Sequence, residues 1–165
     1  MSLGRLVRHL FTTHWRVRWV FPRAALEAIE RAIRESRTQH VGEIRFAVEG
    51  ALHGARLYHG QSPRERAIEV FSLLRMWDTE HRNGVLIYLL LADRAVEIVA
   101  DRGAHARIGS EGWEGICCKM QAAFREGRYE AGAIAGIQMV TACLAEHFPA
   151  RASERNELPD APAVL

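Results

Sequence analysis

The feature of this sequence that most constrains its fold is an unbroken apolar run over residues 84–91. A short polar break at 92–94 follows it, and then a second run, 95–100, that is rich in β-branched residues. A strand that is apolar on both faces is typical of the centre of an α/β sheet, where helices cover both sides. The break is short enough for a hairpin, so we expect the two runs to pair antiparallel.

The predicted hairpin would gather polar residues at one edge of the sheet. Five of them precede the central strand and three follow its partner: Asp78, Glu80, His81, Arg82 and Asn83, then Asp101, Arg102 and His105. Residues 42–49 alternate apolar and charged side chains, which is typical of a half-buried strand. If this strand runs parallel to the central one, Glu43 at its start joins the same edge, which becomes the candidate polar site.

Helical periodicity accounts for most of the remaining chain. We expect helices over residues 3–13, 22–37, 62–77, 110–127 and 129–147, with an extended segment over 14–21. Ser62 and Glu65 form a capping box, and Gly132 and Gly136 allow another element to approach the last helix closely. One parallel crossover and one hairpin predict a single-domain α/β fold, a three-layer α/β/α sandwich with a small mixed β-sheet.

The composition limits the number of domains and the classes of partner. A chain of 165 residues, 48% of them hydrophobic, supports one core. We divide it into a basic amphipathic arm (1–21), an α/β/α domain (22–148) and an extended tail (149–165). A net charge of +2 argues against nucleic-acid binding. Three cysteines, two of them adjacent, fit a reducing compartment. We find no signal peptide, and the longest uncharged stretch, 131–145, is too short to span a bilayer, so we expect a cytoplasmic protein.

The arm contains several arginines and aromatic residues and no acidic residue, since the first acidic residue of the chain is Glu27. Residues 3–13 place their apolar side chains on one helical face. Trp15, Val17 and Trp19 then alternate with arginines in a period of two, which predicts an extended segment. The residues expected to make contacts are Arg5, Arg8, Trp15, Arg16, Arg18 and Trp19. Such an arm could lie on the anionic inner face of the membrane, bind a protein partner, or pack on its own domain.

Short motifs along residues 22–148 resemble the TPM domain family. They are Gly42-Glu43-Ile44, the run from Asn83-Gly84, the Asp93-Arg94 turn, and the series Phe124, Gly127, Tyr129 and Gly132. The resemblance implies an α/β/α fold. It also implies the activities described for relatives, which are acid phosphatase activity, assistance in membrane-protein assembly, and binding of calcium or other divalent ions. Two positions depart from the family pattern, namely Arg82, where an aspartate is usual, and residues 100–103, where a glycine-rich turn is usual.

The polar edge offers two kinds of chemistry. Oxygen atoms of Glu43, Asp78, Asn83 and Asp101, with Glu80 nearby, are the ligands that Ca²⁺ or Mg²⁺ prefers. Arg82 and Arg102 would instead neutralise these acids in an arginine–carboxylate network. For a phosphatase, the arginines would bind phosphate while His81 and His105 exchange protons near neutral pH. The chain has no Walker loop, nucleophile elbow or two-histidine zinc helix.

These observations favour a non-catalytic protein that requires no cofactor and acts through protein contacts, in the assembly or maintenance of membrane proteins. A divalent-metal-dependent acid phosphatase and a peripheral membrane-surface module are the alternatives. The opposite edge of the sheet contains Glu49 and the Asp93-Arg94 turn, where open parallel sheets usually bind ligands. Because the sheet has a single crossover, we expect Asp93 and Arg94 to form only the hairpin turn.

Overall fold

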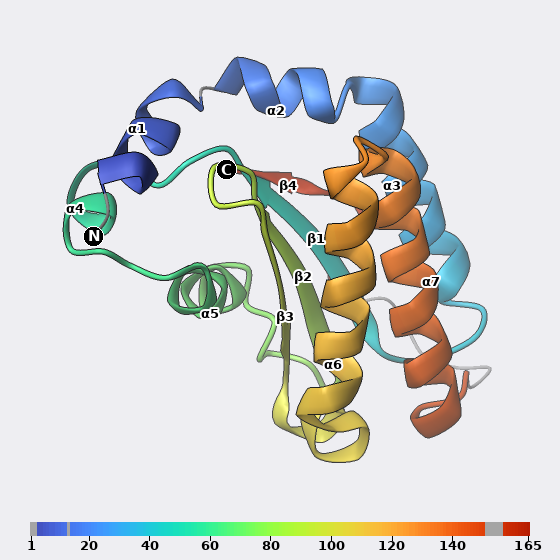
Figure 1. The fold of residues 1–165 in the computed structure, drawn as a ribbon. Helices are drawn as coiled ribbons and strands as arrows, with labels where there is room; N and C mark the ends of the chain where they lie inside the picture. Colours follow the sequence, from blue (N-terminus) through green and yellow to red (C-terminus); the bar gives the residue numbers. More distant parts are fainter. Residues whose placement is uncertain (1–2, 13, 151–156) are drawn as a thin grey trace.

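The computed structural model describes residues 3–12, 14–150 and 157–165, which form a mixed sheet between two layers of helices (Figure 1). The helices are α1 (Leu3–Phe11), α2 (His14–Val20), α3 (Arg23–Ser36), α4 (Gly54–Tyr58), α5 (Pro63–Leu73), α6 (Arg102–Arg125) and α7 (Tyr129–His147). The strands are β1 (Glu43–Glu49), β2 (Gly84–Leu90), β3 (Ala95–Ala100) and β4 (Ala163–Val164). The three-layer α/β fold with a mixed sheet is confirmed.

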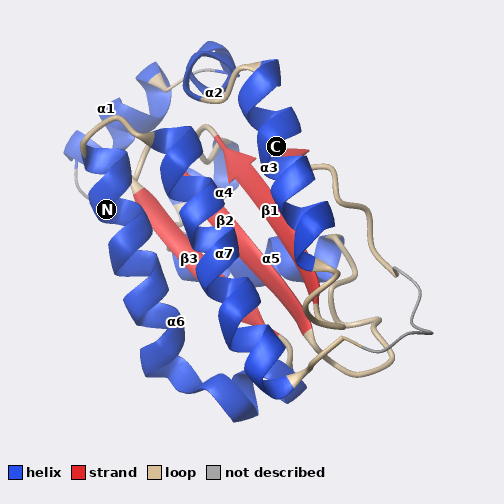
Figure 2. Cartoon of the chain, turned by 90° about the vertical axis from the view of Figure 1, so that its right-hand side faces the viewer, coloured by secondary structure: helices blue, strands red, loops and turns tan. Residues whose placement is uncertain are grey.

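The sheet has the order β3-β2-β1-β4. β1 and β2 run parallel with Glu43 opposite Gly84, and β2 and β3 form the predicted antiparallel hairpin. Helices α3, α6 and α7 cover one face, and α4 and α5 lie on the other (Figures 1 and 2). β1 and β2 are buried on both faces because their alternate side chains enter two separate apolar clusters, so the prediction that residues 42–49 form a half-buried strand is wrong. β3 is buried or half-buried along its length. Ile87 packs under α3, α6 and α7, while Leu86 packs towards α5.

Close packing between α6 and α7 depends on the glycines predicted to permit it. A methyl group added at Gly132 would lie 2.8 Å from the ring of Phe124, and one at Gly136 would overlap the sulfur of Met120. The two helices therefore approach more closely than larger residues would allow. The capping box at the start of α5 is also confirmed, with Glu65 N donating to Ser62 Oγ at 3.2 Å and Ser62 N donating to the Glu65 carboxylate at 2.7 Å.

The prediction of an extended segment over residues 14–21 is wrong, because this segment is helix α2. The two-residue alternation of the tryptophans hid a second pattern. Val17, Val20 and Phe21 are spaced as one helical face, and all three are buried. Trp15 and Trp19, one turn apart, lie on the exposed side.

Four other features differ from the sequence prediction. α6 begins at Arg102 with Asp101 as its N-cap, but its backbone is non-helical at Gly109 (φ 77°, ψ 165°), where two helices meet. The second of them starts at Ser110 as predicted, and the first, which ends before Gly109, was not predicted. α5 ends at Leu73, short of residue 77, and α4 occupies part of a predicted loop. At the end of the chain, β4 pairs parallel with β1, opposite Ala47 and Val48. Two residues are too few to give a readable period, so the sequence did not indicate a strand there.

Candidate functional site

The predicted polar edge is brought together by the backbone. Glu43 begins β1 beside the start of β2, and the amide of Asp101 donates to the carbonyl oxygen of Gly84 at 2.8 Å. Asn83, Glu43 and Asp101 therefore meet at one edge, as the hairpin and the parallel pairing required.

The side chains at this edge are used to hold the chain's own loops. Glu43 Oε1 accepts from the backbone amide of Glu157 at 2.9 Å, which ties the C-terminal segment across the edge. Asn83 Nδ2 donates to the carbonyl oxygen of Val41 at 3.0 Å, and Asp101 Oδ1 caps α6 through the amide of Arg102 at 2.7 Å. Burial raises the pKa of Glu43 above its ordinary value, although the amide of Glu157 opposes this shift.

The remaining predicted residues are scattered around this edge. Asp78 and Glu80 lie in the exposed loop before β2, where the amide of Glu80 donates to the carboxylate of Glu157 at 3.2 Å. Arg82 has a positive φ of 49°, and its carbonyl oxygen accepts from the amide of Gly103 at 3.0 Å. His81 and His105 line two different small cavities, of about 280 and 230 Å³.

Among the described residues, this edge shows neither a complete arginine–carboxylate network nor a group of three metal-ligating side chains. Within the described ranges, no carboxylate lies within ion-pair distance of Arg82 or Arg102, so the expected arginine–carboxylate network is not formed. In the same part of the chain, no three His, Cys, Asp or Glu side chains gather as metal ligands. Calcium or magnesium binding by Glu43, Asp78, Asn83 and Asp101 stays a prediction.

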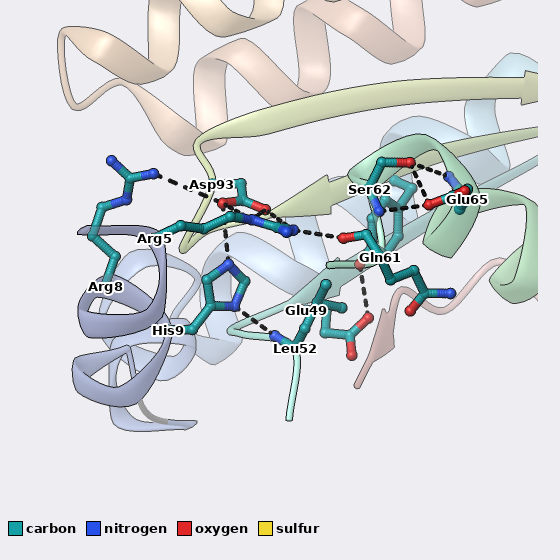
Figure 3. Close-up of polar contacts among 10 residues, drawn as sticks. Arg5, Arg8, His9, Glu49, Leu52, Gln61, Ser62, Glu65 and Asp93 are labelled. Atoms are coloured by element: carbon teal, nitrogen blue, oxygen red, sulfur yellow. Dashed lines mark hydrogen bonds and ion pairs between the residues drawn. The ribbon is translucent and has the colours of Figure 1, made fainter. Parts of the chain in front are cut away.

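A connected polar cluster lies at the opposite edge of the sheet, around Asp93 (Figure 3). Arg5 from α1 donates to both carboxylate oxygens of Asp93, with Nε–Oδ1 at 3.1 Å and Nη2–Oδ2 at 2.7 Å, and Nη2 also donates to the carbonyl oxygen of Gln61 at 2.6 Å. Arg8 lies farther away, with Nη2 at 4.0 Å from Asp93 Oδ1. The turn residue Asp93 is thus an anchor for the arm as well as part of the hairpin.

His9 completes this anchor and fixes its geometry. Its side chain is fully buried, its Nδ1 accepts from the backbone amide of Leu52 at 2.9 Å, and its Nε2 lies 3.1 Å from Asp93 Oδ1. Because Nδ1 accepts a hydrogen bond, the ring proton is on Nε2, which donates to the carboxylate. Burial raises the pKa of Asp93, but the hydrogen bonds from Arg5 and His9 outweigh it and bring the net pKa below 3.8.

A second buried ion pair lies at the same end of the sheet. Glu49, the last residue of β1, accepts from Arg66 Nε at 2.8 Å and Nη2 at 3.2 Å, and its Oε2 also accepts from the Tyr88 hydroxyl at 2.7 Å. Burial raises the pKa of Tyr88, and the neighbouring carboxylate raises it further. Through the hydrogen bonds from Arg66 and Tyr88, Glu49 links β1 to α5 and β2. We therefore assign this cluster a structural role.

These anchors hold α1 with its apolar side turned outward. The polar residues Arg5 and His9 face the domain and Leu6 packs on the apolar cluster beneath α5, whereas Leu10 and Phe11 are 67% and 81% exposed. α2 continues this surface, since Trp15 and Trp19 are 81% and 82% exposed. We call the exposed apolar and basic side chains of α1 and α2 the arm surface: Val7, Arg8, Leu10, Phe11, Trp15, Arg16, Arg18 and Trp19.

Sequence reasoning named Arg5 for the arm but missed His9, and it assigned Asp93 to the turn alone. The available signal was the i, i+4 spacing of Arg5 and His9, which puts both on the side of α1 away from its apolar stripe. Nothing local specifies Asp93 as their partner, because it lies more than eighty positions away along the chain.

Comparisons with known proteins agree with this fold. The family model of the TPM domain matches residues 18–143. The NMR structure of the BA42 protein from the psychrophilic bacterium Bizionia argentinensis is 29% identical and superposes with a TM-score of 0.75, covering 86% of this chain and 93% of that one. The N-terminal domain of a protein from P. gingivalis is 20% identical and superposes with a TM-score of 0.63, covering 78% of this chain and 81% of that one. This similarity supports the fold alone. A search of curated proteins gives no match.

Proposed function

Because this chain belongs to the TPM domain family, we propose that it is a non-catalytic TPM-domain protein that acts by contact, with its arm surface docked on an anionic membrane. This location fits the role in membrane-protein assembly or maintenance that the family resemblance implies. The observation that carries the proposal is the outward-facing apolar side of α1 and α2. None of the described helices is long and apolar enough to cross a bilayer, so the contact we propose is peripheral.

Exposed apolar side chains are concentrated on the arm. Of the ten large hydrophobic side chains exposed in the described part of the chain, five belong to α1 and α2, namely Val7, Leu10, Phe11, Trp15 and Trp19. Scattered exposed residues are ordinary, whereas a concentration of this kind marks an interaction surface. Tryptophan and phenylalanine beside arginine are the residues that amphipathic helices place at the boundary between lipid headgroups and acyl chains.

The charge of the arm selects an anionic surface. No acidic residue occurs before Glu27, and Arg8, Arg16 and Arg18 are exposed among the apolar side chains. An arginine near an anionic leaflet contributes about 1 kcal/mol to binding. A protein partner would need a strongly acidic apolar groove to match the same surface, and we treat that as the competing outcome.

The anchor makes the arm a preorganised binding element. Arg5 and His9 hold α1 on Asp93, while Val17 and Val20 hold α2 in the core, so the exposed side chains do not have to be ordered on binding. Lower ordering cost leaves more of the contact energy for affinity. Insertion of a large apolar side chain contributes about 1.5–3 kcal/mol.

The experiment measures co-sedimentation of the full chain with vesicles that contain equal parts of phosphatidylglycerol and phosphatidylcholine. We expect binding that weakens with added salt and falls about a hundredfold in the double variant Phe11→Ser/Trp15→Ser, since two insertions contribute about 3 kcal/mol together. The matched control is Leu73→Ser/Trp77→Ser, which removes two exposed apolar side chains outside the arm and should bind like the wild type.

Two results would overturn the proposal. If the arm variant and its control bind the vesicles equally, the arm surface does not make the contact. If the wild type binds pure phosphatidylcholine vesicles as tightly as the anionic ones, charge does not contribute. The non-catalytic part is tested separately with an aryl phosphate from pH 4 to pH 8, with and without calcium or magnesium. Hydrolysis that is lost in Asp101→Asn would support the metal-dependent phosphatase instead.

A further inference from the structure

A cavity of about 410 Å³ lies between α2, the carboxyl end of β2 and the junction of α6 with α7. We propose that it binds a small organic anion with an apolar body, whose carboxylate or phosphate head is held by three arginines. This site goes beyond the proposed membrane contact, because it depends on residues of the turn after β2 and of α6 that the arm surface does not include.

The charge of the cavity points to an anion. Arg16 from α2, Arg94 from the hairpin turn and Arg125 from the end of α6 all line it, and no carboxylate does. Within the described ranges, none of these three guanidinium groups makes a hydrogen bond or ion pair. Guanidinium groups match carboxylate and phosphate oxygens in pairs.

The remaining walls indicate an apolar body attached to that anion. Leu89 and Leu91 are buried at the end of β2, Phe124 is buried on α6, and the exposed ring of Trp19 stands at the rim. The volume falls within the range of about 300–1,000 Å³ typical of small-molecule sites. An inorganic anion would leave this apolar wall unused.

The position of the cavity is one that α/β proteins use for ligands. It lies at the carboxyl end of β2, which runs parallel to β1, and ligands bind outside the carboxyl ends of parallel strands in open sheets. α7 begins at the cavity with Tyr129, and the side chain of its N-cap residue, Arg128, does not cap the helix but donates to Glu126. The partial positive charge of that helix end adds to the charge of the arginines.

The backbone conformation at Arg94 provides a clean variant for testing the site. Arg94 has φ of 52°, a left-handed conformation that suits glycine and costs an arginine about 1–2 kcal/mol. Arg75 and Arg82 share this conformation, so it does not by itself mark a functional residue, but it makes glycine an unstrained replacement. Arg94→Gly should therefore delete one arginine of the cavity while relieving strain.

The experiment titrates the full chain with octyl phosphate below its micelle concentration, followed by calorimetry and by amide shifts of residues 89–91. We expect octyl phosphate to bind at least tenfold more tightly than either octanol or inorganic phosphate. Arg94→Gly and Arg125→Gln should each weaken octyl phosphate about tenfold, which is the effect of one charged hydrogen bond. The control is Arg75→Gly, which removes an exposed arginine at a similar φ of 54° outside the cavity, and it should bind like the wild type.

Equal weakening by Arg94→Gly and Arg75→Gly would overturn the site, as would octyl phosphate binding no tighter than octanol. A melting temperature of Arg94→Gly at or above the wild-type value shows that lost binding is not unfolding. Vesicles with phosphatidic acid distinguish the source of the anion. If the amide shifts of residues 89–91 seen with octyl phosphate are reproduced by the vesicles, the ligand is a membrane lipid; if octyl phosphate produces them and the vesicles do not, it is a free amphiphile. The Phe11→Ser/Trp15→Ser variant should retain octyl phosphate binding, so this site and the membrane contact can fail independently.

Discussion

Asp93→Asn should release α1 from the domain without unfolding the rest. Asp93 accepts two hydrogen bonds from the Arg5 guanidinium and one from His9, and its side chain is only 9% exposed. Hydrogen bonds to charged groups contribute about 1.5–3 kcal/mol each. Because Arg5 is partly exposed and the amide oxygen of the variant can still accept one bond, we discount the sum to about 3 kcal/mol, equivalent to a hundredfold rise in the opening of α1.

The assay is amide hydrogen exchange followed by NMR. The reporter is the buried amide of Leu52, which donates to His9 Nδ1 and can exchange only when α1 lifts away. Its exchange should accelerate about a hundredfold in Asp93→Asn, while amides of the core helix α3 around Ile29 keep their wild-type rates. Glu27→Gln, which removes one exposed ion pair with Arg23, should change exchange at Leu52 by less than twofold.

Acid should have the same effect on the wild-type protein. The pKa of Asp93 is below 3.8 in the folded state, so its carboxylate stabilises the docked arm above pH 3.8 and loses this effect as the pH falls through the folded pKa. Asp93→Asn should not show this additional opening. Unchanged protection of Leu52 in the variant, or equal loss of protection at Leu52 and Ile29, would refute the assignment of Asp93 as the local anchor of α1.

Three further predictions concern stability. Gly136→Ala should lower the free energy of unfolding by about 1–3 kcal/mol, since the new methyl group overlaps a side chain of α6. Gly115→Ala has nothing within 4 Å of the new methyl group and should raise the free energy of unfolding by about 1 kcal/mol. Denaturant titrations that rank the two variants in the opposite order would contradict the packing between α6 and α7. Glu49→Gln should cost about 3 kcal/mol in the same assay, because it leaves the buried Arg66 guanidinium without its main carboxylate; a loss below about 1 kcal/mol would argue against the pair. Millimolar calcium should leave the melting temperature unchanged, since Glu43 is already engaged by a backbone amide, and a rise would reveal ion binding by mass action.

The sheet could be predicted because its information is local. The apolar run of β2 and the short break after it indicate a buried strand and its antiparallel partner within a few residues. The alternation of β1 identified the strand but not its burial, because its charged residues Glu43, Arg45 and Glu49 are buried as well. The same reasoning failed at α2, where Trp15, Val17 and Trp19 form an alternation that competes with the helical face of Val17 and Val20. Core contacts decide between the two patterns, and they are not visible within the segment itself.

The site was predictable as a place but not as a set of contacts. Strand direction brought Glu43, Asn83 and Asp101 to one edge, yet the groups that occupy their side chains come from loops and from the C-terminal segment. The anchor of Arg5 on Asp93 and the three-arginine cavity depend on distant pairings of the same kind. Such contacts depend on the assembled fold, so the periodicity or spacing of residues within one segment cannot predict them.

The pairing of β4 with β1 has a consequence for the order in which this protein folds. Ala163 lies opposite Ala47, and the helices α5, α6 and α7 are all synthesised between them. Closing so long a loop for a two-residue strand is unfavourable until the template strand is already fixed. We therefore expect β4 to join the sheet late in folding, after β1, β2 and their covering helices have packed together.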